Sequence, residues 1–250
     1  MVRVIMHGAG GYMGAVVTEF AAKDAEVEIV AGVDVRTEVA RPYPVFATLA
    51  ECPEADAIID FSTAKAVDGL LAYAVEKQVP LVLCTTGLSE EQLAKVEEAA
   101  KKVAVLRSAN MSLGVNLLLK LLKEAASVLV PAGFDAEIME MHHRRKLDAP
   151  SGTAIALADS VNEGAGGDLK YVYDRSERRA ARDPKEMGIV ALRGGTVPGT
   201  HDVVFAGEDE LIEFKHTAYS RSIFAKGAIQ AAKYLAGKGA GMYSMADVIG

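Results

Sequence analysis

The first part of the chain alternates between short apolar runs and segments in which apolar residues recur every three or four positions. The runs are rich in β-branched residues, as strands buried on both faces usually are, and they cover 2–8, 28–34, 55–62, 80–86 and 104–110. Helical spacing marks 11–23 and 64–77, and Ser89 and Gln92 form a capping-box pattern at the start of 89–102. This strand–helix alternation predicts an α/β domain with a doubly wound parallel sheet.

A different pattern begins after about residue 113. Helical spacing marks 115–129 and 151–162, whereas strand-like runs cover 134–143, 189–195, 201–208 and 211–219. A polar stretch, 164–187, lies between them and is expected to be mobile. Consecutive strands separated by turns that contain Gly or Asp predict an α+β domain with a largely antiparallel or mixed sheet.

A last helix is expected over 222–239, with Gly237 near its end and with the inward-facing residues Phe224, Ile229, Ala232 and Leu235. We therefore expect two domains. The first comprises 1–113 together with 221–250. The second comprises 114–220.

The first domain contains a glycine-rich turn, GAGGYMG at 8–14, which follows the first predicted strand, opens the first predicted helix and is a candidate dinucleotide-binding site. The G-x-x-G-x-x-G spacing of Gly8, Gly11 and Gly14 is weak evidence on its own. Such glycines let the backbone approach a pyrophosphate, to which the helix N-terminus offers unpaired N–H groups. Asp34 lies twenty residues after Gly14, at the end of the second strand, where an acid can bind an adenosine ribose. The context predicts a Rossmann-type domain.

Two interpretations remain open for Arg36, which lies two residues after Asp34. It is either a solvated loop cation or a partner for the 2′-phosphate of NADP. An acid and an arginine this close together permit either cofactor. The sequence therefore predicts that both NADH and NADPH are used.

The composition narrows the possible functions. Of the 250 residues 50% are hydrophobic, and the formal net charge of −7 argues against nonspecific nucleic-acid binding, which usually needs a basic stripe. Cys52 and Cys84 are too few and too far apart for a disulfide framework or a zinc site. No signal-peptide pattern begins the chain, and no apolar run approaches the roughly 20 residues that span a bilayer. We expect a soluble, cytoplasmic protein without nucleic-acid or membrane partners.

Titratable and cationic residues are concentrated in EIMEMHHRRKLDAPSGTA, at 137–154. His142 and Lys146 lie four residues apart where a predicted strand runs into a loop, so they could converge on one pocket and relay a proton. The Ser-Gly-Thr turn at 151–153 opens a helix and could bind an anion through N–H groups and hydroxyls. A pocket with these donors suits a small dicarboxylate.

Other interpretations of this segment are a structural histidine, a solvated charge run and a metal site. His142 and His143 cannot easily hold one cation, because adjacent strand residues point to opposite faces of a sheet. No carboxylate-rich cage accompanies them. We therefore expect no metal.

The segment 137–154 resembles the signature of the 4-hydroxy-tetrahydrodipicolinate reductase family, formerly called dihydrodipicolinate reductase, of the diaminopimelate route to lysine. The resemblance covers nearly the whole chain. LRGGTVPGTH at 192–201 and HTAYSR at 216–221 are similar to family motifs, and CTTG at 84–87 stands where the family usually has Gly-Thr-Thr-Gly. The resemblance implies NAD(P)H-dependent reduction of 4-hydroxy-tetrahydrodipicolinate with loss of water. It also implies a homotetramer assembled through the sheet of the second domain.

Individual roles follow from the same resemblance. His142 is implied as proton donor or acceptor and Lys146 as proton donor. The implied substrate-binding residues are His143, Ser151, Gly152 and Thr153. The implied cofactor-binding residues are Gly8, Ala9, Gly10, Gly11, Tyr12, Met13, Asp34, Cys84, Thr85, Thr86, Ser108, Ala109, Asn110 and Met111. Arg36 joins these candidates from its position beside Asp34 and not from the resemblance. The chain departs from the family pattern at Cys84 and in lacking a basic residue directly after Asp34.

Two other functions would also explain the glycine-rich turn. A related Rossmann dehydrogenase could act on another small dicarboxylate or on an amino-acid semialdehyde, but aspartate and homoserine dehydrogenases lack the HHRRK…SGT segment in this form. A non-catalytic, nucleotide-sensing module would leave His142, Lys146 and 151–153 without a purpose. The reductase function is therefore the one expected.

Overall fold

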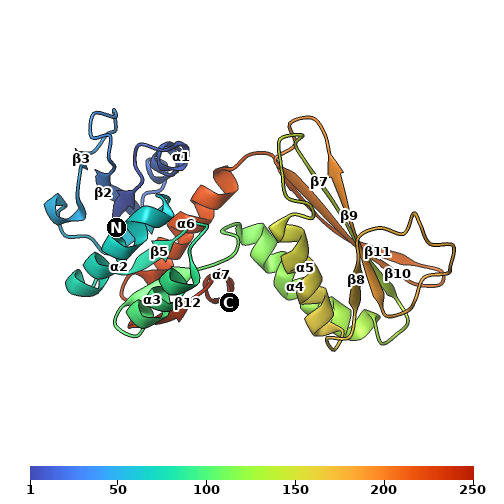
Figure 1. Cartoon of the computed structure of the whole chain (residues 1–250). Coiled ribbons are helices and arrows are strands. Elements are labelled where there is room, and N and C mark those ends of the chain that lie inside the picture. The colour runs from blue at the N-terminus through green and yellow to red at the C-terminus, as the bar shows by residue number, and fades with distance from the viewer. The chain divides into compact units, whose positions relative to one another are not determined.

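The computed structural model describes all residues, 1–250, and divides into two compact units (Figure 1). Unit 1 consists of Met1–Leu113 and Ser222–Gly250, and unit 2 consists of Gly114–Arg221. The first boundary lies where the sequence analysis placed it, and the second differs by one residue. Unit 1 is therefore built from both ends of the chain.

Unit 1 contains a seven-stranded sheet with the order β12-β6-β5-β4-β1-β2-β3, in which every neighbouring pair is parallel. The strands are β1 (Val2–His7), β2 (Val27–Val33), β3 (Val45–Phe46), β4 (Ala57–Asp60), β5 (Leu81–Leu83), β6 (Ala104–Arg107) and β12 (Gly241–Tyr243). In β1, Val4 and Met6 pack into one hydrophobic core and Ile5 into the other. Burial on both faces explains why these strands are apolar throughout.

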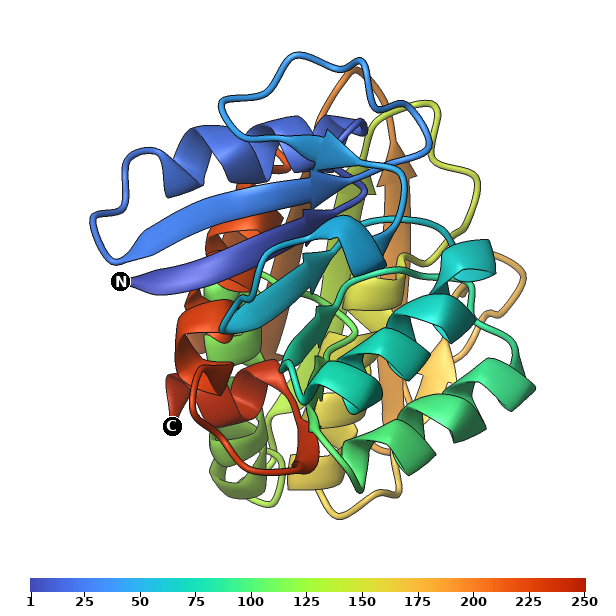
Figure 2. The same cartoon turned by 90° about the vertical axis from the view of Figure 1, so that its left-hand side faces the viewer.

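Helices cover both faces of this sheet (Figure 2). The helical elements of unit 1 are α1 (Tyr12–Ala21), α2 (Ala64–Lys77), α3 (Glu90–Ala100), α6 (Ser222–Leu235), α7 (Met245–Ile249) and the 3-10 turn η1 (Leu49–Glu51). α1 and α6 share one core, whereas α2 and α3 share the other. The capping box predicted at Ser89 is present, and Gly237 has a φ of +79°, which suits the end of α6.

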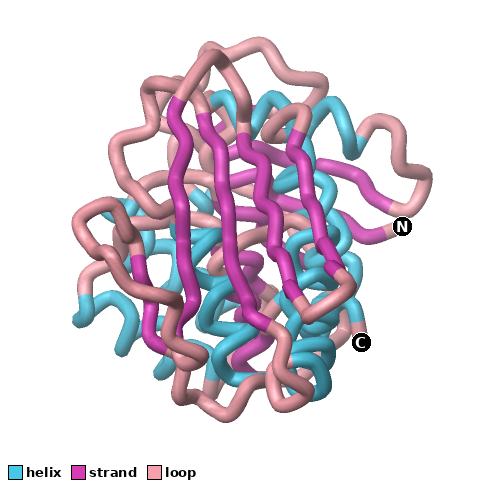
Figure 3. Tube along the Cα trace, turned by 90° about the vertical axis from the view of Figure 1, so that its right-hand side faces the viewer, coloured by secondary structure: helices cyan, strands magenta, loops and turns pink.

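Unit 2 contains a five-stranded mixed sheet with the order β11-β10-β7-β9-β8. Its strands are β7 (Asp135–His142), β8 (Lys170–Val172), β9 (Glu186–Arg193), β10 (Gly199–Ala206) and β11 (Leu211–Ala218). β7 is antiparallel to β10 and parallel to β9. Two helices, α4 (Leu113–Leu129) and α5 (Gly152–Gly164), pack on one face and leave the other uncovered (Figure 3). The predicted fold class, a Rossmann-type domain plus a domain with a mixed sheet, is confirmed.

The polar stretch 164–187 has more structure than the sequence predicted. It contains β8, and Arg175 donates two hydrogen bonds to the Glu137 carboxylate, at 2.9 and 2.8 Å. Arg182 donates to the same carboxylate at 2.9 Å. These ion pairs join residues far apart in the sequence, so a local polar pattern could not reveal them.

The sequence analysis also missed β3, β12 and α7, which contain two, three and five residues. Elements this short carry too few positions for a periodic pattern to emerge. No helix in the structure combines the length and the apolar character needed to cross a membrane.

Candidate functional site

Three glycines of the turn between β1 and α1 have no room for a side chain. Gly8 has a φ of +86°, and a Cβ there would lie 2.6 Å from the Phe61 carbonyl oxygen. A Cβ on Gly14 would lie 2.5 Å from the Gly8 carbonyl oxygen. A Cβ on Gly10 would lie 2.7 Å from the Asp34 carboxylate. Close backbone packing therefore requires glycine at positions 8 and 14, and the Asp34 side chain leaves space only for glycine at position 10. The small residues leave the start of α1 open to a ligand.

Asp34 comes directly after β2 and lies against this turn. Its Oδ2 accepts a hydrogen bond from the Gly10 N–H at 2.8 Å, and its Oδ1 accepts one from the Arg36 N–H at 3.0 Å. The Arg36 guanidinium donates to the Gly10 carbonyl oxygen at 2.5 Å. Arg41, which the sequence analysis missed, donates from Nε to the Ala9 carbonyl oxygen at 3.0 Å. The turn is thus bordered by one acid and two arginines.

Buried oxygens without partners gather at the carboxyl ends of β4 and β5. They are Asp60 Oδ2, Ser62 Oγ and Thr85 Oγ1. Buried polar groups are nearly always hydrogen-bonded, so three orphans beside the glycine-rich turn indicate a place for a polar ligand. Ligands of doubly wound sheets bind at this edge. The residues present therefore fit a dinucleotide.

Cys84 and the segment 108–111 lie near the same edge of the sheet. The side chain of Cys84 packs against the hydrophobic core, and burial raises the pKa of its thiol well above the ordinary value. Its backbone N–H donates to the Asp60 carbonyl oxygen at 3.0 Å. The Asn110 Oδ1 accepts a hydrogen bond from the Ser112 N–H at 2.8 Å. Thr86 and Ala109 are exposed, as is Tyr12 at the start of α1.

In unit 2, a row of polar residues crosses the helix-covered face of the sheet. Glu140, His201 and His216 lie opposite one another on β7, β10 and β11. The His142 and His201 rings are 5.1 Å apart in an edge-on arrangement. His142, at the end of β7, pairs in register with Arg193 on β9. The sheet register therefore brings together histidines that are far apart in the sequence.

Glu140 is fully buried and receives four hydrogen bonds. Its Oε2 accepts from His142 Nδ1 and from an Arg193 nitrogen, both at 2.7 Å. Its Oε1 accepts from the second Arg193 nitrogen at 2.8 Å and from the Ser151 N–H at 2.9 Å. Burial raises the pKa of the Glu140 carboxyl, but the hydrogen bonds from Arg193, His142 and Ser151 outweigh it and leave the pKa below its ordinary value. Glu140 is therefore a carboxylate.

The loop after β7 carries the other predicted catalytic residue. The His143 N–H donates to the Val197 carbonyl oxygen at 2.8 Å, and the Lys146 N–H donates to the His143 carbonyl oxygen at 3.0 Å. The Lys146 ammonium contacts the Asp148 carboxylate at 2.8 Å. Its charge also acts on His201, whose pKa it helps to lower. Lys146 therefore lies on the loop that directly follows His142 and His143, with its ammonium held by Asp148.

The predicted helix start at Ser151 is confirmed, since α5 begins at Gly152. The Ser151 hydroxyl accepts a hydrogen bond from the Ala154 N–H and contacts His201 Nε2, both at 3.1 Å. Ser151 is 2% exposed, so its side chain holds the helix end from inside. Gly152 is exposed at the first position of the helix, where backbone N–H groups attract anions.

Burial gives His201 an unusually low pKa. Burial is the main cause that lowers the pKa of His201 to about 4; the neighbouring His142, His216 and Lys146 add to the decrease, although Glu140 acts in the opposite direction. Burial also lowers the pKa of His216. His201 is therefore neutral at pH 7 and serves as a hydrogen-bonding partner for Ser151.

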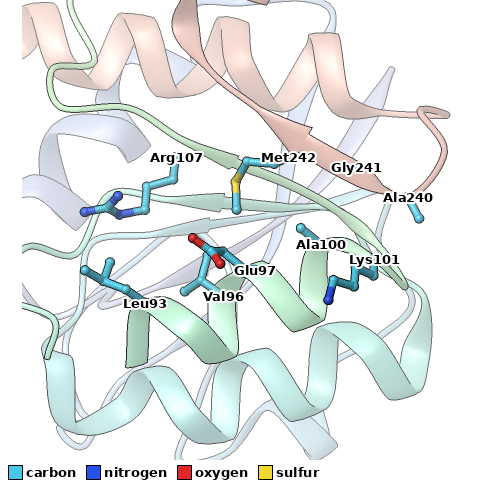
Figure 4. A pocket seen from close by; sticks show the side chains of 9 residues that line it. All are labelled: Leu93, Val96, Glu97, Ala100, Lys101, Arg107, Ala240, Gly241 and Met242. Atoms are coloured by element: carbon cyan, nitrogen blue, oxygen red, sulfur yellow. The ribbon is translucent and has the colours of Figure 1, made fainter. Parts of the chain in front are cut away.

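A groove at the edge of the unit 1 sheet is unrelated to these residues. Side chains from α3, β6 and β12 line it, among them Glu97, Arg107 and Met242 (Figure 4). None of the predicted site residues lines this groove. The candidate site is therefore identified from the chemistry of its side chains and not from this groove.

Comparison with known proteins identifies relatives of both units. The family profiles "Dihydrodipicolinate reductase, N-terminus" and "Dihydrodipicolinate reductase, C-terminus" match residues 2–111 and 114–249. A 4-hydroxy-tetrahydrodipicolinate reductase of Caldanaerobacter subterraneus subsp. tengcongensis is 49% identical over 250 residues, which are 100% of this chain and 98% of the relative. The same enzyme of Clostridium tetani is 44% identical over 98% of this chain and 96% of its own length.

A solved structure has the same architecture. Dihydrodipicolinate reductase from Paenisporosarcina sp. TG-14, determined with dipicolinate bound, matches with a TM-score of 0.83 and 25% sequence identity. The match covers 100% of this chain and 99% of that one. Both halves of the sequence and the whole fold thus lead to one conclusion: the chain belongs to the dihydrodipicolinate reductase family.

Proposed function

We propose that this chain reduces 4-hydroxy-tetrahydrodipicolinate to tetrahydrodipicolinate at the expense of NADH or NADPH, in lysine biosynthesis through diaminopimelate. The observation that carries the proposal is a cluster in unit 2, where hydrogen bonds of Glu140 and Arg193 join His142, the start of α5 and the loop that carries Lys146. This cluster combines proton donors with a helix terminus suited to a carboxylate. Relatives named 4-hydroxy-tetrahydrodipicolinate reductase are 49% and 44% identical to the chain.

Unit 1 would hold the dinucleotide. The glycine-rich turn would receive the pyrophosphate, and Asp34 would bind the adenosine ribose. The orphaned oxygen of Thr85 and the segment 108–111 would contact the nicotinamide end. When bound, the dinucleotide supplies a hydride.

Unit 2 would supply substrate binding and the proton. The net reaction takes up one hydride and one proton and releases one water. Lys146 would donate the proton, and His142 would donate or accept one through the ring nitrogen that Glu140 does not hold. Gly152, Thr153 and His143 would bind the substrate, with Ser151 holding the helix start in place.

A direct assay tests this function. Freshly made 4-hydroxy-tetrahydrodipicolinate should oxidise NADH or NADPH in the presence of the full chain, whereas aspartate semialdehyde should not. Oxidation with the semialdehyde alone would support a dehydrogenase of another specificity. Binding of dinucleotide without turnover on either compound would support a nucleotide-sensing module. The cytoplasmic location expected from the sequence stays a prediction.

The proposed dual use of cofactors depends on the residues that border the glycine-rich turn. The Asp34 carboxylate should accept hydrogen bonds from the free ribose of NADH but repel the 2′-phosphate of NADPH. Arg36 lies beside that carboxylate, with its Nε 3.7 Å from Asp34 Oδ1, and partly offsets the repulsion. We therefore expect NADH to be used at least as well as NADPH.

Substitution of these residues should separate the two cofactors. Asp34→Ala should shift the ratio of kcat/KM values toward NADPH by about 10-fold or more, since a hydrogen bond to a charged group contributes about 1.5–3 kcal/mol. Arg36→Ala should weaken NADPH alone. Steady-state kinetics with both cofactors measures these ratios, and Glu28→Ala, an exposed acid on β2, is the matched control. The parent enzyme could instead strongly prefer NADPH, with Arg36→Ala leaving kcat/KM for NADPH unchanged. That result would mean that another cation contacts the 2′-phosphate, and Arg41 is the first candidate.

The uncovered face of the unit 2 sheet supports the proposed homotetramer. Met139 on β7 and Val190 and Leu192 on β9 are 44%, 46% and 44% exposed, and their registers place them side by side. Met141 extends this apolar strip along β7. A contiguous apolar strip on an open sheet face is typical of a surface that another protein surface covers. We infer that a second copy of this chain packs there, as the family resemblance implies.

A charge on the strip should dissociate the assembly. Val190→Asp would place an unpaired carboxylate in a desolvated interface, which is strongly unfavourable. Size-exclusion chromatography with light scattering should then detect a smaller species than the parent tetramer. Val128→Asp, at a 67% exposed position on α4, should leave the assembly unchanged. A parent protein that is monomeric at micromolar concentration would overturn the proposal.

A further inference from the structure

The Glu140 carboxylate touches three separate parts of the proposed site. Its oxygens accept hydrogen bonds from His142 at the end of β7, from Arg193 on β9 and from the Ser151 N–H at the start of α5. The carboxylate has no solvent exposure, so these donors have no competition from water. One buried side chain thus connects the strand, the neighbouring strand and the helix.

Arg193 extends this connection to the loop that carries Lys146. Besides its two hydrogen bonds to Glu140, the Arg193 guanidinium donates to the Asp148 carbonyl oxygen at 2.7 Å. The Asp148 carboxylate in turn accepts from the Lys146 ammonium at 2.9 and 2.8 Å. The position of Lys146 therefore depends on Glu140 through two intermediate residues.

The contact with His142 also has a chemical consequence. Because a carboxylate can only accept hydrogen bonds, His142 Nδ1 must carry the proton when the ring is neutral, and Nε2 is then the basic nitrogen. A Cβ at Gly199 would lie 2.9 Å from Nε2, so the glycine keeps that side of the ring open. Glu140 therefore determines which ring nitrogen of His142 is basic, and Gly199 leaves space beside that nitrogen.

We propose that Glu140 is the positioning residue of this site: it fixes the tautomer of His142 and holds the start of α5 and the Lys146 loop in place. The inference rests on the proposed roles of His142 and Lys146. Glu140 itself reaches neither substrate nor cofactor, because it is buried beneath the residues that it orients. The arrangement follows the general rule that a proton-transfer histidine needs a fixed partner on its second nitrogen.

Glu140→Gln tests the proposal with little change in shape. An amide has one oxygen, which cannot serve all four donors. The Ser151 N–H can only donate, whereas an imidazole can move its proton to Nε2 and accept at Nδ1. The amide oxygen should consequently face Ser151, its NH₂ group should face His142, and the ring should change to the Nε2–H tautomer.

Two readouts of the full-length chain check this. Ring ¹⁵N–¹H correlation spectra, taken without substrate at a pH where the ring is neutral and assigned with His142→Asn, should show Nδ1–H in the parent and Nε2–H in Glu140→Gln. The kcat should fall about 10²–10⁴-fold while the KM for the dinucleotide stays unchanged, because unit 1 is untouched. Glu186→Gln is the control, since Glu186 is a buried carboxylate that binds Arg178 without contacting a histidine.

The outcomes separate this inference from the proposed function. A parent without reductase activity would refute the proposed function, but the spectra would still report which nitrogen Glu140 holds. Glu140→Gln with the parental tautomer and kcat would overturn the positioning role, as would an equal loss of kcat in Glu186→Gln. If Glu140→Gln does not fold, Glu140→Asp is the second variant, because it keeps the negative charge but moves the carboxylate away from His142 by the length of one methylene group. A kcat that remains at the parental level in that variant would likewise overturn the role.

Discussion

Lys146→Ala and His142→Ala should each lower kcat about 10²–10⁴-fold, the usual cost of losing one general acid or base. The Lys146 ammonium is held by Asp148, and His142 is held by Glu140, so both groups are oriented before substrate arrives. Neither residue belongs to unit 1. The dissociation constant of the dinucleotide should therefore stay close to that of the parent, which isothermal titration calorimetry can measure alongside the kinetics.

The matched control is Lys185→Ala, which removes an exposed lysine of unit 2 that pairs only with Asp168 at 3.3 Å. Its kcat should equal that of the parent, because an exposed ion pair contributes little. A double variant of His142 and Lys146 that turns over substrate at the parental rate would remove the catalytic assignment altogether. Loss of dinucleotide binding in either single variant would show instead that the substitution had disturbed the fold.

The architecture of unit 1 was largely predictable because its strands are buried on both faces. Val4, Ile5 and Met6 of β1 are all fully buried, so the strand appears in the sequence as an unbroken apolar run. The glycine-rich turn was equally informative, since the close approaches at Gly8 and Gly14 permit no other residue. Burial of a strand and close packing at a turn each restrict residues that are adjacent in the sequence, so both can be recognised from a short stretch of it.

The parts that could not be predicted depend on long-range contacts. Arg175 binds Glu137 across 38 positions of sequence, and Arg193 binds Glu140 across 53. A segment rich in arginine looks like a solvated loop when its partners are unknown. The ordered structure within 164–187 and the connection from β9 to the Lys146 loop were missed for this reason.

The candidate site was predicted only in part, for the same reason. His142, Lys146 and the Ser151 helix start were recognisable because they are close together in one segment. Glu140 lies two positions before His142, on the same face of β7, and this period-two spacing could have marked it. His201 could not be placed beside His142 until the register of β7 and β10 was known.

Substitution of one helix glycine in unit 1 should lower both the stability and the cofactor affinity of the protein. Gly227 lies in α6, and a Cβ there would stand 1.6 Å from the Met111 carbonyl oxygen. That oxygen belongs to the backbone of the segment 108–111, which cannot rotate away as a side chain would. Gly227→Ala should therefore lower the free energy of unfolding by about 1–3 kcal/mol or more. It should also raise the KM for the dinucleotide, because the displaced segment is a proposed cofactor contact.

Gly69 provides the matched comparison, since it lies in α2 with no atom within 4 Å of the position that a Cβ would take. Gly69→Ala should raise the free energy of unfolding by up to about 1 kcal/mol, because alanine loses less backbone entropy than glycine in a helix. Chemical denaturation of the two variants should thus give shifts of opposite sign. The decisive kinetic result is the dinucleotide KM: an increase in Gly227→Ala and none in Gly69→Ala would tie the Met111 backbone to cofactor binding. Equal stabilisation by both substitutions would mean that α6 does not closely approach the Met111 carbonyl oxygen, and it would contradict the prediction.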